Sequence, residues 1–162
     1  MANSPKIIFD RKKLVAAVGK LKRAGKKVVF TNGCYDLLHV GHVRFLKAAR
    51  KLGGALVLAL NSDASVRRIK GPKRPVTREN ERAEVMSALS SVDIVTIFHE
   101  DDPYNIIKDI VPDVLVKGGD WALDKIIGAD IVKAAGGKVL NVPYIKGKST
   151  TNVIEKVLKY YR

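Results

Sequence analysis

The 162-residue sequence predicts an α/β fold built on a parallel sheet. Short runs of β-branched and other apolar residues alternate along the chain with longer segments of helical period, a pattern typical of consecutive βαβ units. The apolar runs are continuous, as expected of strands that helices cover on both faces. We therefore expect a Rossmann-like, doubly wound parallel sheet of about five strands, with residues 1–162 forming a single domain.

The expected strands are the most apolar of these runs: Val28–Thr31, Leu56–Leu60, Val92–Ile97, Val114–Val116 and Val139–Val142. An opening helix is expected over Arg11–Arg23, where apolar side chains recur at helical spacing. Further helices are expected between the strands, over Val40–Leu52, Glu79–Leu89, Pro103–Ile110 and Lys125–Ala135. Gly136 and Gly137 end the last of these, and the hydroxyl groups of Ser149–Thr151 cap a final helix that runs to about Tyr160.

Three features of the sequence bear on the location of the protein. No apolar run approaches the roughly 20 residues that span a bilayer, so we expect no membrane insertion. Residues Met1–Asp10 lack the apolar core of a signal peptide. The single cysteine, Cys34, excludes a disulfide framework and fits a reducing compartment. We therefore expect a cytoplasmic protein.

The chain is strongly basic, with 30 Lys and Arg against 16 Asp and Glu and a net charge of +14. Such a charge attracts anions, so the candidate partners are nucleic acid, an anionic membrane or a phosphorylated small substrate. Several basic residues fall within Arg67–Arg78, which we expect to be a loop because it contains Gly71, Pro72 and Pro75. Aromatic residues make up 6% of the chain and none interleaves with these charges, which disfavours a stacking surface for nucleic acid.

A polar segment, Thr31–His42, follows the first expected strand and contains two of the three histidines. The spacing of His39 and His42 at the entrance to a helix can place both imidazoles on one side. Gly41 between them lets a ligand approach the backbone closely, and the start of the helix offers unpaired N–H groups to a phosphate. The segment therefore indicates a site for phosphoryl groups whose oxygens gain charge during reaction.

Thr31–His42 resembles the T-x-G-x-[FY]-D-x-x-H-x-G-H signature of the cytidylyltransferase-like nucleotidyltransferases. A second motif of that family, a basic residue and glycine before S-T-T at a helix start, appears at Lys146–Thr151. The order and spacing of the two motifs fit the family, so the resemblance covers nearly the whole chain. Within the family, further stretches look most like the heptose 1-phosphate adenylyltransferases: Leu60–Gly71, Arg74–Val76, Glu81–Ala83 and Val116–Trp121.

The resemblance implies transfer of AMP from ATP to D-glycero-β-D-manno-heptose 1-phosphate, giving ADP-heptose and pyrophosphate for lipopolysaccharide core synthesis. It also implies Mg²⁺ bound mainly through the ATP phosphates, without dedicated protein ligands, and a homo-oligomer. A same-class alternative is a CTP-dependent enzyme of the glycerol-3-phosphate cytidylyltransferase type. An alternative of a different class is a basic nucleic-acid-binding module, which would have no use for the histidine pair.

By the same resemblance, the catalytic residues are His39, His42 and Lys148. The residues expected to bind the nucleotide come from the two motifs and from the loop after the fourth strand: Thr31, Asn32, Gly33, Cys34, Tyr35, Asp36, Gly41, His42, Lys117, Gly119, Asp120, Ser149, Thr150 and Thr151. Those expected to bind the acceptor are Asn61, Arg68, Lys70, Arg82 and Trp121.

Five of these residues have a second interpretation that the sequence leaves open. Asp36 either orients a basic group or binds the metal through water, or it caps the turn. Asn61 either bonds a sugar hydroxyl or closes its loop, and Trp121 either walls the ligand or packs on the core. Arg82 is typical of an exposed helical arginine as well as of a substrate contact, and Cys34 is expected to be a small buried residue.

Overall fold

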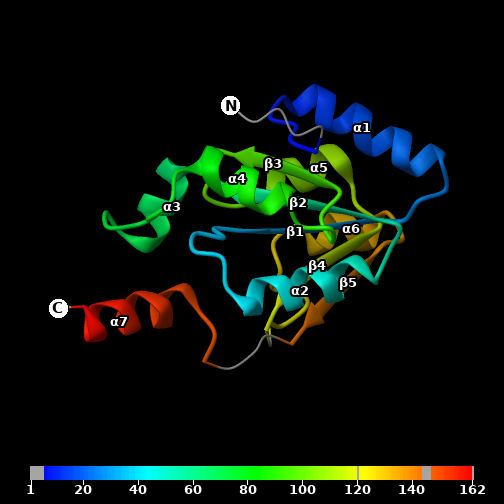
Figure 1. Ribbon diagram of the computed structural model, residues 1–162. Coiled ribbons are helices and arrows are strands. Elements are labelled where there is room, and N and C mark those ends of the chain that lie inside the picture. Colours follow the sequence, from blue (N-terminus) through cyan, green and yellow to red (C-terminus); the bar gives the residue numbers. More distant parts are fainter. Residues whose placement is uncertain (1–5, 120, 144–146, 162) are drawn as a thin grey trace.

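The computed structural model describes residues 6–119, 121–143 and 147–161, and Figure 1 shows their arrangement. Five strands form one parallel sheet in the order β3-β2-β1-β4-β5. They are β1 (Val28–Gly33), β2 (Ala55–Asn61), β3 (Ile94–Phe98), β4 (Val114–Gly118) and β5 (Lys138–Val142). The predicted Rossmann-like sheet is confirmed, whereas the extent of a single domain over residues 1–162 stays a prediction.

Helices cover both faces of the sheet because successive side chains of a strand point to opposite sides. Phe30 of β1 joins a core cluster on the face covered by α1 (Arg11–Arg23), α5 (Tyr104–Ile110) and α6 (Ala129–Ala134). The adjacent Val29 joins a second cluster on the face covered by α2 (Val40–Arg50) and α4 (Glu79–Ser87). In the described part of the chain, no helix combines the length and the apolar character needed to cross a membrane.

Two further helices lie beyond the carboxyl ends of the strands, α3 (Asp63–Lys70) and α7 (Thr150–Tyr160). Figure 1 shows both projecting from the side of the sheet on which β1 leads into α2. No side chain of α7 is buried. These two helices therefore contribute little to the main core and instead flank the space outside the strand ends.

Helix α3 corrects the expectation of a loop over Arg67–Arg78. Ser62 caps the start of this helix, because its hydroxyl accepts a hydrogen bond from the Ser65 N–H at 3.2 Å. The helix ends at Gly71, whose φ of 92° suits glycine. The glycine and prolines that suggested a loop lie after the helix, so the loop is confined to residues 71–78.

Two elements begin later than the sequence predicted. The strand expected from Val92 begins at Ile94, because the Asp93 carboxylate accepts a hydrogen bond from the Leu56 N–H and holds the preceding turn. The helix expected from Lys125 begins only at Ala129. The N-cap Gly128 has a φ of 84°, which is not a helical conformation, so the helix begins only after it. Gly128 also packs closely against the side chain of Ile107.

Glycine-to-alanine substitutions at two positions should change stability in opposite directions. A Cβ at Gly53, in the turn between α2 and β2, would lie 2.6 Å from the Lys27 carbonyl oxygen and 2.6 Å from Val29 Cγ2. Gly53→Ala should therefore lower the free energy of unfolding by about 1–3 kcal/mol. Gly19→Ala, inside α1, should raise it by about 0.5–1 kcal/mol, because only the end of the Arg23 side chain lies near. Urea unfolding of both variants measures the two changes, and equal signs would contradict the expectation.

Candidate active site

A cavity of about 630 Å³ opens at the carboxyl ends of the strands. It lies where β1 and β4 are neighbours, because the chain adds β2 and β3 on one side of β1 and then returns to add β4 and β5 on the other. Ligands of open parallel α/β sheets bind at such a switch point. The cavity brings together most of the residues predicted from the sequence: Thr31, Asn32, Gly33, Cys34, Tyr35, Asp36, His39, Gly41, His42, Asn61, Lys70, Lys117, Trp121, Lys148, Ser149, Thr150 and Thr151.

The loop from β1 to α2 is shaped by Tyr35, which adopts a positive φ of 47° and is almost fully buried. Its ring lies against Gly33, where a Cβ would stand 2.9 Å from the ring. The same ring packs on His42 with 4.8 Å between centroids. Gly33 therefore allows Tyr35 to fold under the loop and support one of the two histidines.

The two histidines of the first motif are stacked, with ring centroids 3.7 Å apart and an interplanar angle of 23°. The expectation that both imidazoles lie on one side is confirmed. Burial lowers the pKa of His39, and burial together with the neighbouring His39 lowers the pKa of His42 to about 4. Both rings are therefore neutral near pH 7, and each offers one N–H donor.

The start of α2 lies beside the histidines. His39 is its N-cap but makes no side-chain cap hydrogen bond, and the N–H groups of Val40 and Gly41 have no hydrogen-bond partner among the described residues. A Cβ at Gly41 would lie 2.9 Å from the His39 ring and 3.3 Å from Lys148 Cβ. Glycine at this position therefore allows the His39 ring and Lys148 to pack against the start of α2. The free N–H groups of such a helix start can bind a phosphate.

The second motif forms the start of α7, beside the start of α2. Ser149 caps this helix by accepting a hydrogen bond from the Asn152 N–H at 3.1 Å, while Thr150 and Thr151 line the cavity with Lys148. Lys146 and Asp120 lie outside the described residues. The two motifs, more than a hundred residues apart in the sequence, thus face one space.

At the ends of the central strands, Lys117 of β4 donates a 2.5 Å hydrogen bond to Asn32 Oδ1 of β1. Both residues line the cavity. Burial lowers the pKa of Lys117 to about 8. Gly119, which was also predicted to contact the nucleotide, is buried just after β4 with a φ of 96° and does not line the cavity.

Asp36 holds the loop after α3. Its carboxylate accepts hydrogen bonds from the N–H groups of Val76 and Thr77, and it pairs with Arg74 Nε at 2.6 Å. Burial raises the pKa of Asp36, but these hydrogen bonds outweigh burial and leave that pKa below its ordinary value. Asp36 thus fulfils two of the roles that the sequence left open, because it caps a turn and orients a basic group. Its side chain has no exposed surface for a nucleotide contact.

Arg82 corrects both interpretations that the sequence allowed. Its side chain is fully buried and donates to the carbonyl oxygens of Cys34, Asn61 and Thr77, at 2.5, 2.8 and 3.1 Å. It also pairs with the Asp63 carboxylate at 2.8 Å. Arg82 is therefore neither an exposed arginine nor a substrate contact, and it holds the ends of β1 and β2 to α4.

Other predicted acceptor residues differ in their surroundings. Asn61 is buried and donates to Ser65 Oγ, so it closes its loop as one alternative held. Arg68 does not line the cavity and is paired with Asp101, so its acceptor contact stays a prediction. Trp121 is 60% exposed on the rim rather than packed on the core. Cys34, expected to be buried, is only partly so.

Sequence reasoning missed several residues of the lining. One of them is Arg74, which pairs with Asp36. The two residues are 38 positions apart, so no local pattern in the sequence indicates their contact. Asp101 and Asp102 follow the end of β3, where ligands of parallel sheets bind, so their position in the chain could have indicated them. The apolar lining residues Phe45, Ile69 and Ile127 carry no signal that distinguishes them from core positions.

Comparison with known proteins identifies the family of this chain. The profile of the Cytidylyltransferase-like family matches residues 30–156. The chain belongs to the cytidylyltransferase-like family.

Relatives of this family member include Bifunctional protein HldE of Trichlorobacter lovleyi, 52% identical over 154 residues that make up 95% of this chain and 31% of that protein. Bifunctional protein HldE of Geobacter sulfurreducens is 53% identical over 91% of this chain and 30% of that protein. The chain thus spans about a third of the length of these curated relatives. Among solved structures, the lipopolysaccharide core biosynthesis protein from Thermoplasma volcanium is similar, with a TM-score of 0.62 and 31% identity, over 75% of this chain and 98% of that one.

The low pKa of His42 should make folding stability depend on pH. Above the ordinary histidine pKa of about 6.5 the ring is neutral in both states. As pH falls from there toward about 4, the unfolded chain binds a proton that folded His42 does not, so the free energy of unfolding decreases. Urea unfolding at pH 7.5 and pH 5 should show a smaller decrease for His42→Asn than for the wild type. The exposed His99→Asn variant is the control, and an equal decrease in all three proteins would contradict the expectation.

Replacing Arg82 should destabilise the fold, since three carbonyl oxygens and a carboxylate would lose their donor. Arg82→Met is expected to lower the free energy of unfolding by about 3 kcal/mol. Arg67→Met, on the exposed surface of α3, should change it by less than about 0.5 kcal/mol. Chemical denaturation measures both values, and a loss at Arg82 no larger than the loss at Arg67 would overturn its structural role.

Proposed function

We propose that the protein transfers AMP from ATP to D-glycero-β-D-manno-heptose 1-phosphate, giving ADP-heptose and pyrophosphate for lipopolysaccharide core synthesis. The observation that carries the proposal is the stacked, neutral pair His39 and His42 at the start of α2, which lines one cavity together with Lys148 and the start of α7. A triphosphate is the ligand whose length and charge suit two helix starts and a lysine in one space.

The reaction needs alignment and charge neutralisation more than covalent participation by the protein. An oxygen of the acceptor phosphate forms a bond to the α-phosphorus of ATP, and the bond from that phosphorus to the oxygen bridging to the β-phosphate breaks. Because the attacking oxygen is already anionic, no side chain has to remove a proton. Neutral His39 and His42 donate hydrogen bonds to phosphate oxygens, and Lys148 with Ser149–Thr151 holds the leaving pyrophosphate.

The wall formed by α3 and the loops after it and after β3 supports a phosphorylated sugar as acceptor. Lys70 and Arg74 line this part of the cavity, and Asp36 pairs with Arg74 Nε only, which leaves its two Nη groups without a partner among the described residues. Such a guanidinium fork suits a phosphate. Asp101 and Asp102 line the same cavity, and carboxylates accept hydrogen bonds from sugar hydroxyls but repel phosphate.

Mg²⁺ is part of the proposal as an ion that enters with ATP. Within the described part of the chain, no group of three or more acidic, histidine or cysteine side chains could hold a metal, and Asp36 is occupied by backbone and arginine donors. This surrounding suits an ion that takes most of its ligands from phosphate oxygens and water. When bound, Mg²⁺ supplies positive charge to the phosphate chain.

The remaining proposals concern context. A homo-oligomer is supported by the apolar side chains that α7 exposes, such as Val157 at 51% and Leu158 at 45%. The cytoplasmic location is supported by the expected reducing compartment and by the substrates themselves. The choice of ATP over CTP rests on the sequence stretches that resemble the heptose 1-phosphate adenylyltransferases.

A pyrophosphate-release assay with Mg²⁺ tests the reaction by crossing ATP and CTP with heptose 1-phosphate, glycerol 3-phosphate and phosphopantetheine. Release is expected only with ATP and heptose 1-phosphate. His42→Ala should lower kcat by about 10²–10³-fold, because a donor to the reacting phosphates is lost. Lys133→Met, at an exposed position of α6 outside the cavity, is the matched control.

Two other outcomes would change the proposal in different ways. Release with CTP and glycerol 3-phosphate would move the protein to the cytidylyltransferases that use that acceptor. No release from folded protein with any pair would overturn the enzyme proposal and favour a polyanion-binding module.

A further inference from the structure

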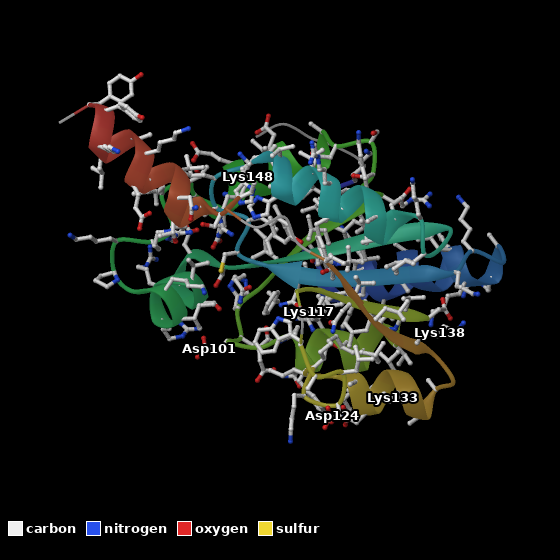
Figure 2. All side chains as sticks on the ribbon, turned by 90° about the horizontal axis from the view of Figure 1, so that it is seen from below. Asp101, Lys117, Asp124, Lys133, Lys138 and Lys148 are labelled. Carbon is white, nitrogen blue, oxygen red and sulfur yellow. The ribbon has the colours of Figure 1, made fainter. Side chains whose placement is uncertain are left out.

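Lys117 occupies the switch point of the sheet. It is the penultimate residue of β4, and its ammonium group donates to Asn32 Oδ1, near the end of β1. The backbone pairing of β1 with β4 covers only Val29 and Phe30 of β1, so the side-chain bond between Lys117 and Asn32 lies beyond the last paired residues. Both side chains line the cavity there, and Figure 2 shows Lys117 near the middle of the view with Lys133 toward its edge.

The ammonium group of Lys117 has no acidic partner among the described residues. The ion pairs in and near the cavity join Arg74 to Asp36 and Arg68 to Asp101, whereas none among the described residues includes Lys117. A cation in a partly buried position without an anion is unfavourable, so the described residues leave room for an anion that none of them supplies.

The groups around Lys117 are neutral near pH 7. On β1 these are the Asn32 amide and, just after it, the Cys34 thiol, whose pKa burial raises. On β5 the residue in register is Asn141. On α2 the His42 ring has a pKa of about 4, and burial also lowers the pKa of His39 at its N-cap. Burial consequently lowers the pKa of Lys117 to about 8, although the nearby Cys34 opposes this change.

We propose that Lys117 binds the phosphate chain of the nucleotide, exchanging its hydrogen bond to Asn32 for one to a phosphate oxygen, and that nucleotide binding is coupled to proton uptake at its amine. The inference rests on the proposed function, because the anion is the phosphate chain of ATP. The fraction of the Lys117 amine that is neutral in the free protein gains a proton from solvent, and the ammonium is held by the phosphate. Bound nucleotide therefore keeps Lys117 in its charged form.

The competing explanation is structural: the bond from Lys117 to Asn32 would only tie β4 to β1 where their backbones no longer pair. A structural tie predicts no exchange of protons when nucleotide binds. A proton taken up by a histidine is distinguishable as well, because histidine uptake would be greatest near pH 5–6 and would vanish by pH 8. Uptake at Lys117 would instead increase from pH 7 to pH 8, where half of the free amine is neutral.

Isothermal titration calorimetry with Mg²⁺ and α,β-methylene ATP, a nucleotide that cannot be cleaved at the reacting bond, tests the coupling without turnover. Titrations at pH 7 and pH 8, each in buffers of different ionisation enthalpy, give the number of protons taken up. We expect about a tenth of a proton per nucleotide at pH 7 and about half a proton at pH 8, as the pKa of about 8 requires.

Two substitutions separate charge from proton uptake. Lys117→Arg stays protonated, so it should bind the nucleotide within a few-fold of the wild type but take up no proton at pH 8. Lys117→Met should lose both the uptake and about tenfold or more in affinity. Lys133→Met, exposed on α6, should behave as the wild type.

Each remaining outcome overturns a stated part. Tight binding by the wild type without proton uptake at pH 8, or uptake that persists in Lys117→Arg, would overturn the role of Lys117 and leave the proposed function intact. No nucleotide binding by the folded wild-type protein would overturn both. Unaltered affinity of a folded Lys117→Met variant would assign the bond to Asn32 a structural role only.

Discussion

The position of β1 in the middle of the sheet is the constraint on which the site depends. The chain leaves β1 toward β2 and β3 on one side, and β4 and β5 add on the other. The connections after β1 and β4 therefore lie on either side of one opening, and the cavity forms between them. Every group of the candidate site, from the β1 loop to the start of α7, is placed by this arrangement.

Burial and charge act in opposite ways on the groups that face this opening. A protein with a net charge of +14 attracts anions over its whole surface, yet the histidines at the centre are neutral because partial burial disfavours their charged forms. They offer hydrogen bonds, while the positive charge comes from residues such as Lys148 and Arg74 on the surrounding walls. The proposed recognition of phosphate groups thus depends on where hydrogen-bond donors and charges are placed rather than on the amount of charge.

Two charged residues hold the loops around the cavity in place. Arg82 binds carbonyl oxygens at the ends of β1 and β2, and Asp36 binds N–H groups of the loop after α3. Each satisfies backbone groups in a region where the chain has left regular structure and has no strand partner for them. This framework fixes the loops to which His39 and Arg74 belong.

The sequence by itself determined the five strands, the helices other than α3 and the two motifs, because apolar runs, cap residues and the spacing of His39 and His42 are local properties of the chain. Only the tertiary structure decided which charged residues line the cavity. The sequence pattern around Arg82 is typical of an exposed helical residue, but its side chain is fully buried. Arg74 is held in the cavity lining by its ion pair with Asp36, 38 positions away. Burial and pairing depend on residues distant in the sequence, whereas strand and helix patterns repeat within a few residues.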